Sequence, residues 1–162
     1  MDDLILSHFS IIGICVDINK GKKIINELVK EINSFVTPIK ISNVYKRDIH
    51  EHINSKKTEL ICALKITTNL KSKELAETLD HLKDKYNDCF VHLLVFDKDI
   101  NIIPELTLPN PILVSDHVIL RCAAEVWENY EHPILGQSLN EIIDSIRVND
   151  KVEFYSQGLS IF

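Results

Sequence analysis

The sequence lacks both a secretory signal and an apolar run long enough to cross a membrane. Its first residues are apolar, but two acids, Asp2 and Asp3, stand where a signal peptide carries basic residues. Ser7 and His8 then interrupt the apolar stretch. We therefore expect a cytoplasmic protein that has no membrane partner.

An excess of positive charge is also missing, because the formal net charge is -6 at pH 7. Nucleic-acid phosphates would be repelled unless basic residues gathered in one patch. The densest lysine cluster, NKGKK at residues 19–23, is too small to form such a patch. We expect no nucleic-acid partner.

Cysteine pairs at metal-binding or redox spacing are absent as well. The sequence has no C-x-x-C motif. Each cysteine lies in an apolar segment, so we interpret all of them as small buried hydrophobic residues in a reducing compartment. They are Cys15, Cys62, Cys89 and Cys122.

Internal repeats, low-complexity segments and a recognisable interdomain linker are not found either. The chain has 162 residues, of which 45% are hydrophobic and 26% charged. This length and composition are typical of one globular domain that buries its own core. We expect a single domain over residues 1–162.

The first half of the chain alternates between strand and helix patterns. The helix expected at 22–35 has apolar residues at helical spacing, and a second helix is expected at 73–86, with Ser72 as its N-cap. A polar loop is expected at 49–58. The expected strands are 9–18, 39–48 and 59–68.

The second half begins with a buried strand at 89–97, followed by a short hairpin or edge strand at 100–108. Two further helices are expected at 118–127 and 138–146, the last with Ser138 and Glu141 as a capping box. The alternating tail at 152–162 predicts an edge strand that could pair with a neighbouring chain. The element order predicts an α+β fold, a ferredoxin-like antiparallel sheet with two helices on one face and extra helices after it.

The stretch from Leu106 to Leu139 resembles a segment of the 6-hydroxymethyl-7,8-dihydropterin pyrophosphokinase (HPPK) family. That family has a Leu-Thr-Leu-Pro-His-Pro turn, a helix opening with Phe-Val-Leu, a His-Pro pair, a Gly and a Leu-rich helix. The first half fits more loosely, through SNVYKRD at residues 42–48. The matching residues are Leu106, Thr107, Leu108, Pro109, Pro111, Leu113, Leu120, Glu125, His132, Pro133, Gly136 and Leu139.

The resemblance implies an HPPK-like fold and a role in folate biosynthesis. The family transfers a pyrophosphoryl group from ATP to the hydroxymethyl group of a reduced pterin, with two Mg²⁺ held by an Asp-Leu-Asp motif. Here the two aspartate positions are occupied by Phe90 and His92. A phenyl ring cannot bind a metal, and imidazole is a poor ligand for Mg²⁺. Asp97 and Asp99 have the right spacing but lie past the strand, so they and His92 are weak metal candidates.

Other family positions also carry different residue types. The aromatic residue and the Asn that hold the pterin correspond to Glu59 and Ile61, and the second stacking aromatic corresponds to Val118. The Arg-rich loop that closes over ATP is reduced to YNDC at residues 86–89. The remaining correspondences are Cys15, Val16 and Asp17 for a Gly-Ser-Asn, Lys85 and Asp116 for two Arg, and Asn110 for the His of the Pro-His-Pro turn.

Three hypotheses follow for the function. The first is a family member, with activity weak or absent unless a shifted site uses Asp17, Asp97 or Asp99 for metal and Phe90 or Tyr45 for stacking. The second is a non-catalytic binding module, which could act beside a folate-pathway protein. The third is a repurposed pocket for a small ligand that is less anionic than ATP.

Overall fold

The computed structural model describes residues 7–52, 55–87, 89–146 and 152–158. The helices are α1 (Gly21–Asn33), α2 (Ser72–Lys85), α3 (Ile112–Ser115), α4 (His117–Val126) and α5 (Leu139–Ser145). The strands are β1 (His8–Asp17), β2 (Thr37–Ile41), β3 (Val44–His52), β4 (Ser55–Thr68), β5 (Cys89–Phe96), β6 (Asn101–Ile103), β7 (Leu106–Leu108) and β8 (Val152–Ser156).

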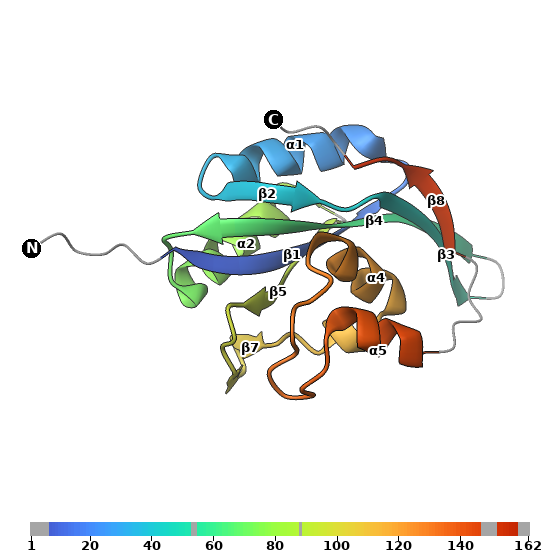
Figure 1. The fold of residues 1–162 in the computed structure, drawn as a ribbon. Coiled ribbons are helices and arrows are strands. Elements are labelled where there is room, and N and C mark those ends of the chain that lie inside the picture. Colours follow the sequence, from blue (N-terminus) through green and yellow to red (C-terminus); the bar gives the residue numbers. More distant parts are fainter. Residues whose placement is uncertain (1–6, 53–54, 88, 147–151, 159–162) are drawn as a thin grey trace, which may run out of the picture.

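One antiparallel sheet organises the fold. Its strands follow the order β5-β1-β4-β3-β8, and β2 also pairs with β4. Strand β1 lies between β4 and β5, and α1 and α2 follow β1 and β4 in the chain, as in a ferredoxin-like arrangement. The expected α+β fold with an antiparallel sheet is therefore confirmed (Figure 1).

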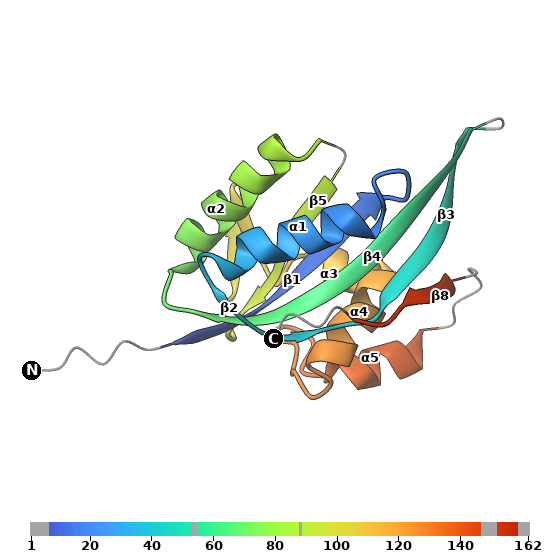
Figure 2. The same ribbon diagram turned by 90° about the horizontal axis from the view of Figure 1, so that it is seen from above.

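The sheet is covered on both faces, which places two core layers in the molecule (Figures 1 and 2). Helices α1 and α2 pack on one face, and α4 and α5 pack on the other. Strand β1 shows the consequence: Ile12 and Ile14 belong to the first layer, and Ile11 and Cys15 to the second. Burial on both sides explains why this strand is apolar throughout instead of alternating.

The single strand expected at 39–48 is wrong, because two strands occupy this range. Ser42 interrupts the chain between β2 and β3 while remaining bound to β4. Its hydroxyl accepts a hydrogen bond from the Ala63 N–H at 2.8 Å, and its own N–H donates to the Ala63 carbonyl at 2.9 Å. Both segments can therefore pair with β4 although the chain changes phase between them.

The polar loop expected at 49–58 is also wrong. Strand β3 continues to His52, and β4 already begins at Ser55, so most of the range forms a two-stranded ribbon. Figure 2 shows this ribbon extending away from the helices. A polar segment that pairs as a strand at such a position resembles a loop in sequence.

The expected capping box on α5 is confirmed. The Ser138 hydroxyl accepts a hydrogen bond from the Glu141 N–H, and the Glu141 carboxylate accepts one from the Ser138 N–H. Ser72 is not an N-cap, because it is already the first residue of α2, and Lys71 stands at the cap position without a side-chain bond. The short helix α3 was not expected from the sequence.

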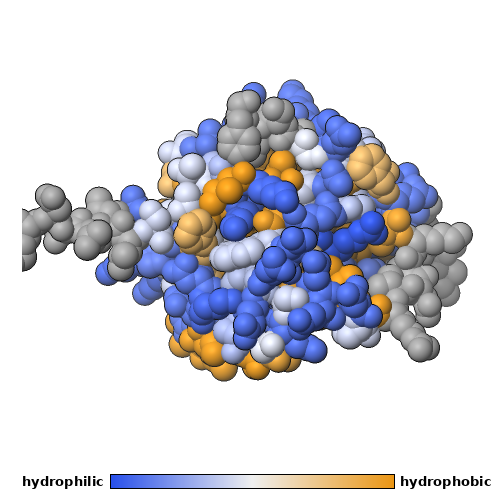
Figure 3. All heavy atoms as spheres, viewed as in Figure 1, coloured by the Kyte–Doolittle hydropathy of each residue, from blue (hydrophilic) through white to orange (hydrophobic). Residues whose placement is uncertain are grey.

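The β6–β7 hairpin expected at 100–108 is present; Leu106 and Leu108 of β7 are buried in the core, whereas the isoleucines of its first half are exposed. Ile102 is 78% exposed, and Ile100 and Ile103 are exposed beside it. The face drawn in Figure 3 is mainly hydrophilic, with an apolar band along the lower edge, where Figure 1 places β7, and smaller apolar spots elsewhere. Among the described residues, no helix has the length and hydropathy needed to span a bilayer.

The tail expected as an edge strand forms β8, which pairs with β3 at one edge of the sheet. The strand ends at Ser156, two residues before the described part of the tail stops. Residues 159–162 lie outside the described residues. Pairing of this edge with a neighbouring chain stays a prediction.

Candidate functional site

The sheet places several of the positions singled out in the sequence in one transverse row. Phe90 of β5 lies opposite Cys15 of β1, Cys15 lies opposite Ile61 of β4, and Ile61 lies opposite Tyr45 of β3. Cys15, Ile61 and Tyr45 belong to the core layer under α4, together with Val118 at the start of that helix. The candidate site is therefore the space between this row and the N-terminus of α4.

Aliphatic side chains fill the middle of that space. Ile61 and Val118, at the positions corresponding to the pterin-reading Asn and a stacking aromatic, are both fully buried. Cys15 beside them is also buried, and this burial, reinforced by the nearby Glu59 and Asp116 charges, raises its thiol pKa far above the usual range. A thiol with a raised pKa is neutral at pH 7 and inert as a nucleophile.

A buried ion-pair cluster adjoins this aliphatic packing. Arg47 of β3 donates to the Asp116 carboxylate at 2.7 Å and to the Glu59 carboxylate at 3.1 Å. The three side chains are only 17%, 15% and 11% exposed for Arg47, Asp116 and Glu59. Glu59 and Asp116 correspond to two positions of the family's substrate pocket. Both are thus paired with Arg47, which bridges the sheet and α4.

Asp116 has a second role in the same cluster. Its carboxylate accepts hydrogen bonds from the Val118 and Ile119 N–H groups and so caps α4. Burial acts to raise the Asp116 pKa, but the Arg47 guanidinium and these two N–H donors outweigh it and hold the pKa below its usual value. The carboxylate is therefore ionised and held in place by three donors, one guanidinium and two backbone amides of α4.

The Asp116 interactions should make stability depend on acid pH. Because its pKa is lower in the folded chain, the stabilisation is complete above the unfolded value of about 3.9 and is lost as pH falls through the folded value. We expect Asp116→Asn to be less stable than the wild type at pH 7. This gap in the free energy of unfolding should narrow below about pH 4. Urea unfolding of both proteins at pH 7 and pH 3 measures this gap. A gap of constant size would contradict the role given to the charge.

Phe90 and His92 lie at the rim of the candidate site and stack on each other. Their ring centroids are 5.9 Å apart, with only 4° between the ring planes. Burial and the nearby Lys83 ammonium lower the His92 pKa, while Asp116 acts in the opposite direction more weakly. A lowered pKa leaves the imidazole neutral at pH 7.

Beside this stack is a cavity of about 290 Å³ between α2, β5 and the β6–β7 hairpin. It brings together His92 and Asn110, two positions derived from the resemblance. Its charged lining residues are Asp80, Lys83 and Glu105, of which Asp80 and Lys83 form an ion pair at 3.4 Å. With two carboxylates and one ammonium, these lining residues carry a net negative charge, which disfavours binding of a polyphosphate.

Asn110 also has a structural role in the Pro-Asn-Pro turn. Its N–H donates to the Leu94 carbonyl at 2.8 Å, and its side-chain oxygen accepts from the Ile112 N–H at 3.0 Å. The flanking prolines, Pro109 and Pro111, lack N–H groups and restrict φ. The turn therefore joins the end of β7 to α3 and holds it against β5.

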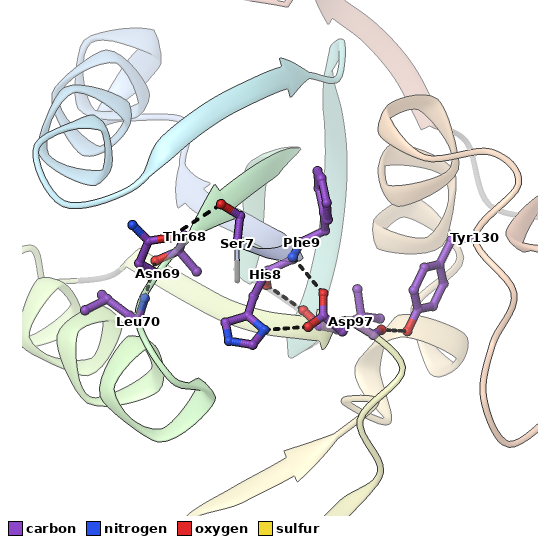
Figure 4. Close-up of polar contacts among 10 residues, drawn as sticks. Ser7, His8, Phe9, Thr68, Asn69, Leu70, Asp97 and Tyr130 are labelled. Atoms are coloured by element: carbon purple, nitrogen blue, oxygen red, sulfur yellow. Dashed lines mark hydrogen bonds and ion pairs between the residues drawn. The ribbon is translucent and has the colours of Figure 1, made fainter. Parts of the chain in front are cut away.

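Asp97, a weak metal candidate, is engaged in a turn at the far end of β5 (Figure 4). One carboxylate oxygen lies 2.6 Å from His8 Nδ1, and the other accepts from the Phe9 N–H at 2.8 Å. The Tyr130 hydroxyl donates to the Asp97 carbonyl at 2.5 Å. With φ of 46°, Asp97 adopts the left-handed conformation that Asp tolerates better than most residues.

Asp99 follows in the same turn, with its N–H bonded to the Phe96 carbonyl. Within residues 7–52, 55–87, 89–146 and 152–158, no group of three or more His, Cys, Asp or Glu is arranged to hold a metal. A phenyl ring and a neutral imidazole at the family's metal positions do not fit Mg²⁺, which requires oxygen ligands. No step through Mg²⁺ or ATP is therefore derived for this chain.

Lys85, at the position of a family Arg, pairs with another helix instead of capping its own. Its ammonium lies 2.5 Å from the Glu31 carboxylate of α1, which also accepts from the Tyr86 hydroxyl at 2.6 Å. These contacts tie the end of α2 to α1.

Arg47 is the site residue that sequence reasoning missed. It stands in the half-exposed pattern of residues 42–48, where a basic residue normally faces solvent. Its partners become visible only from the register, which places Arg47 opposite Glu59. A Glu inside the apolar segment at 59–68 was the available signal, because a buried carboxylate needs a partner.

The fold is similar to that of solved HPPK-DHPS structures. The wild-type Plasmodium falciparum protein matches with a TM-score of 0.65 at 10% identity, over 86% of this chain and 44% of that chain. The same protein with pterin and p-hydroxybenzoate matches at 0.64 and 9% identity, over 89% and 42%. An HPPK-DHPS in complex with substrates matches at 0.69 and 9%, over 85% and 43%.

The likeness is to the HPPK domain, so this chain has an HPPK-like fold. It spans less than half the length of the proteins it matches. No protein-family model and no curated protein matches the sequence. At this level of identity the likeness is one of fold, and function depends on the residues of the site.

Proposed function

We propose that this chain is a degenerate HPPK-like protein that acts by binding and not by pyrophosphoryl transfer. The observation that carries the proposal is the pairing of Arg47 with Glu59 and Asp116. These two carboxylates occupy positions that serve the substrate in the family, and Arg47 links them across the mouth of the site. A pterin could enter only by separating a buried ion pair, at a cost of several kcal/mol (about 3–5).

The chemistry of the rim supports the same proposal. Pyrophosphoryl transfer depends on cations that neutralise the triphosphate and stabilise charge in the transition state. Here the metal positions carry Phe90 and His92, and the cavity beside them has a negative balance. Neither feature provides electrostatic stabilisation for the transfer.

The test is an assay of AMP formation from ATP, Mg²⁺ and 6-hydroxymethyl-7,8-dihydropterin. We expect no AMP above the protein-free blank, while Plasmodium falciparum HPPK-DHPS provides the positive control. Calorimetric titration with a non-hydrolysable ATP analogue and Mg²⁺ should likewise show no binding. AMP formation that scales with the amount of this chain would overturn the proposal.

A second candidate function is favoured by the cavity beside β5. His92 and Asn110 still face a common space of about 290 Å³, close to the size of a small-molecule site. Its two acids and one lysine favour a neutral or cationic ligand over ATP. In a thermal-shift screen, such compounds should raise Tm, polyphosphates should not, and Glu105→Gln should weaken cationic hits most. Polyphosphates as the strongest hits would count against this candidate.

A further inference from the structure

A second cavity lies on the opposite side of α4, away from the metal positions. It has a volume of about 350 Å³ and is enclosed by α4, α5 and the first residue of β8. Figures 1 and 2 both show α4 and α5 near β8, at the edge of the sheet that β8 forms. Its lining is mostly aliphatic, with two ionisable side chains: Val118, Leu120, Ile143, Ile146, Val152, His117 and Arg121.

Arg121 is the cation of this cavity, and its exposed side chain lies over an aromatic ring. The guanidinium carbon lies 4.6 Å from the centroid of the Tyr45 ring. Tyr45 itself is buried and makes an edge contact with Phe154 of β8. A guanidinium that lies over an aromatic ring still has N–H donors for another group.

In the described part of the chain, no carboxylate forms an ion pair with Arg121. Glu125 lies one helical turn further along α4, but its two oxygens accept from Asn43 and Tyr45. The Asn43 N–H donates at 3.1 Å to one oxygen, and the Tyr45 hydroxyl donates to the other. Among the described residues, Arg121 therefore places a positive charge without an ion-pair partner at the edge of an aliphatic cavity.

We propose that this cavity binds a small apolar monoanion, a carboxylate whose anionic group pairs with Arg121. Aliphatic walls favour a hydrocarbon body, and the guanidinium fork favours two parallel bonds to a carboxylate. If each heavy atom fills the ~30 Å³ share of a liquid water molecule, the cavity holds roughly a dozen heavy atoms. That number corresponds to a carboxylate of about ten carbons.

This inference is independent of whether pyrophosphoryl transfer is lost. Phe90, His92 and Glu59 do not line the cavity, and Val118 is the single position shared with the candidate site. A pterin or a nucleotide would place many polar atoms against Leu120 and Ile143, leaving their hydrogen bonds unmade. The ligand expected here is therefore of a different chemical class.

The probe is decanoate, below its micelle concentration, with decanol as its neutral counterpart. Calorimetry gives both affinities, and ¹⁵N-resolved spectra locate the site through the amides of Ile143 and Val152. We expect decanoate to bind at least about tenfold more tightly than decanol. Absence of decanoate binding, equal affinity for both, or shifts confined to another surface would each overturn the proposal.

Two variants test separately the contribution of the Arg121 charge and that of the cavity volume to binding. Arg121→Gln should weaken decanoate about tenfold and leave decanol unchanged, whereas Lys71→Gln, which removes a cation outside the cavity, should change neither. Ile143→Trp should fill the space and abolish binding of both compounds while the chain stays folded. Unchanged decanoate affinity in either cavity variant would contradict the assignment.

Discussion

Replacement of Arg47 by Met is expected to lower the free energy of unfolding by about 3–5 kcal/mol. The guanidinium is the common partner of Glu59 and Asp116, and all three side chains are largely buried. Without it, two carboxylates would remain close together with little access to water, and each would lack its main counter-charge. Urea unfolding followed by circular dichroism at pH 7 measures the loss.

Lys46→Met is the matched control, because Lys46 precedes Arg47 on β3 and also pairs with an acid. Its contact with Glu153 is 4.0 Å long and open to solvent, so we expect a change within about 0.5 kcal/mol. The triple variant Arg47→Met, Glu59→Leu, Asp116→Asn removes the whole cluster and keeps a cap for α4. It should be more stable than Arg47→Met alone, because it leaves neither buried carboxylate without its counter-charge. Equal losses in Lys46→Met and Arg47→Met would refute the account.

Restoring the family's pterin-reading residue by Ile61→Asn should destabilise the chain by about 3–5 kcal/mol. Ile61 is fully buried under α4, so an amide there would lose aliphatic packing and have no ready hydrogen-bond partners. Thermal and urea unfolding measure the effect. In an open pterin pocket the same change would be nearly neutral.

Ile61→Val provides the control, since it keeps an apolar β-branched side chain and should cost about 1 kcal/mol. A combined measurement sharpens the result: the Asn variant should still fail to bind 6-hydroxymethylpterin in a calorimetric titration. A stable Ile61→Asn variant that gains pterin affinity would mean that the family's pterin position is open in this chain and that only its polar residue had been lost.

Much of the fold could be predicted from the sequence, because apolar periodicity distinguishes helices from strands. The stripe of α1 at Ile25, Leu28, Val29 and Ile32 is buried as its spacing indicated. The errors fall where the local pattern has two physical meanings. The polar residues 49–58 are equally compatible with a loop and with a ribbon that leaves the core, and only pairing between β3 and β4 decides which one forms.

The candidate site was harder to predict than the fold. The resemblance identified positions that differ from the family, but a list of differing residues does not show what replaces the lost function. The answer lies in a contact between residues 47, 59 and 116, which depends on strand register and on the position of α4. The cavity around Arg121 escaped sequence reasoning for the same reason, because α5 and β8 close it only in three dimensions.

The distribution of cysteines over the two core layers has a practical consequence. Cys62 and Cys89 lie in the layer under α1 and α2, and Cys15 and Cys122 lie in the layer under α4. All four thiols are buried and form no disulfide, so an alkylating reagent reaches each one only when its own layer opens. Mass-spectrometric labelling rates at these four natural positions therefore report separately how often each side of the sheet is uncovered.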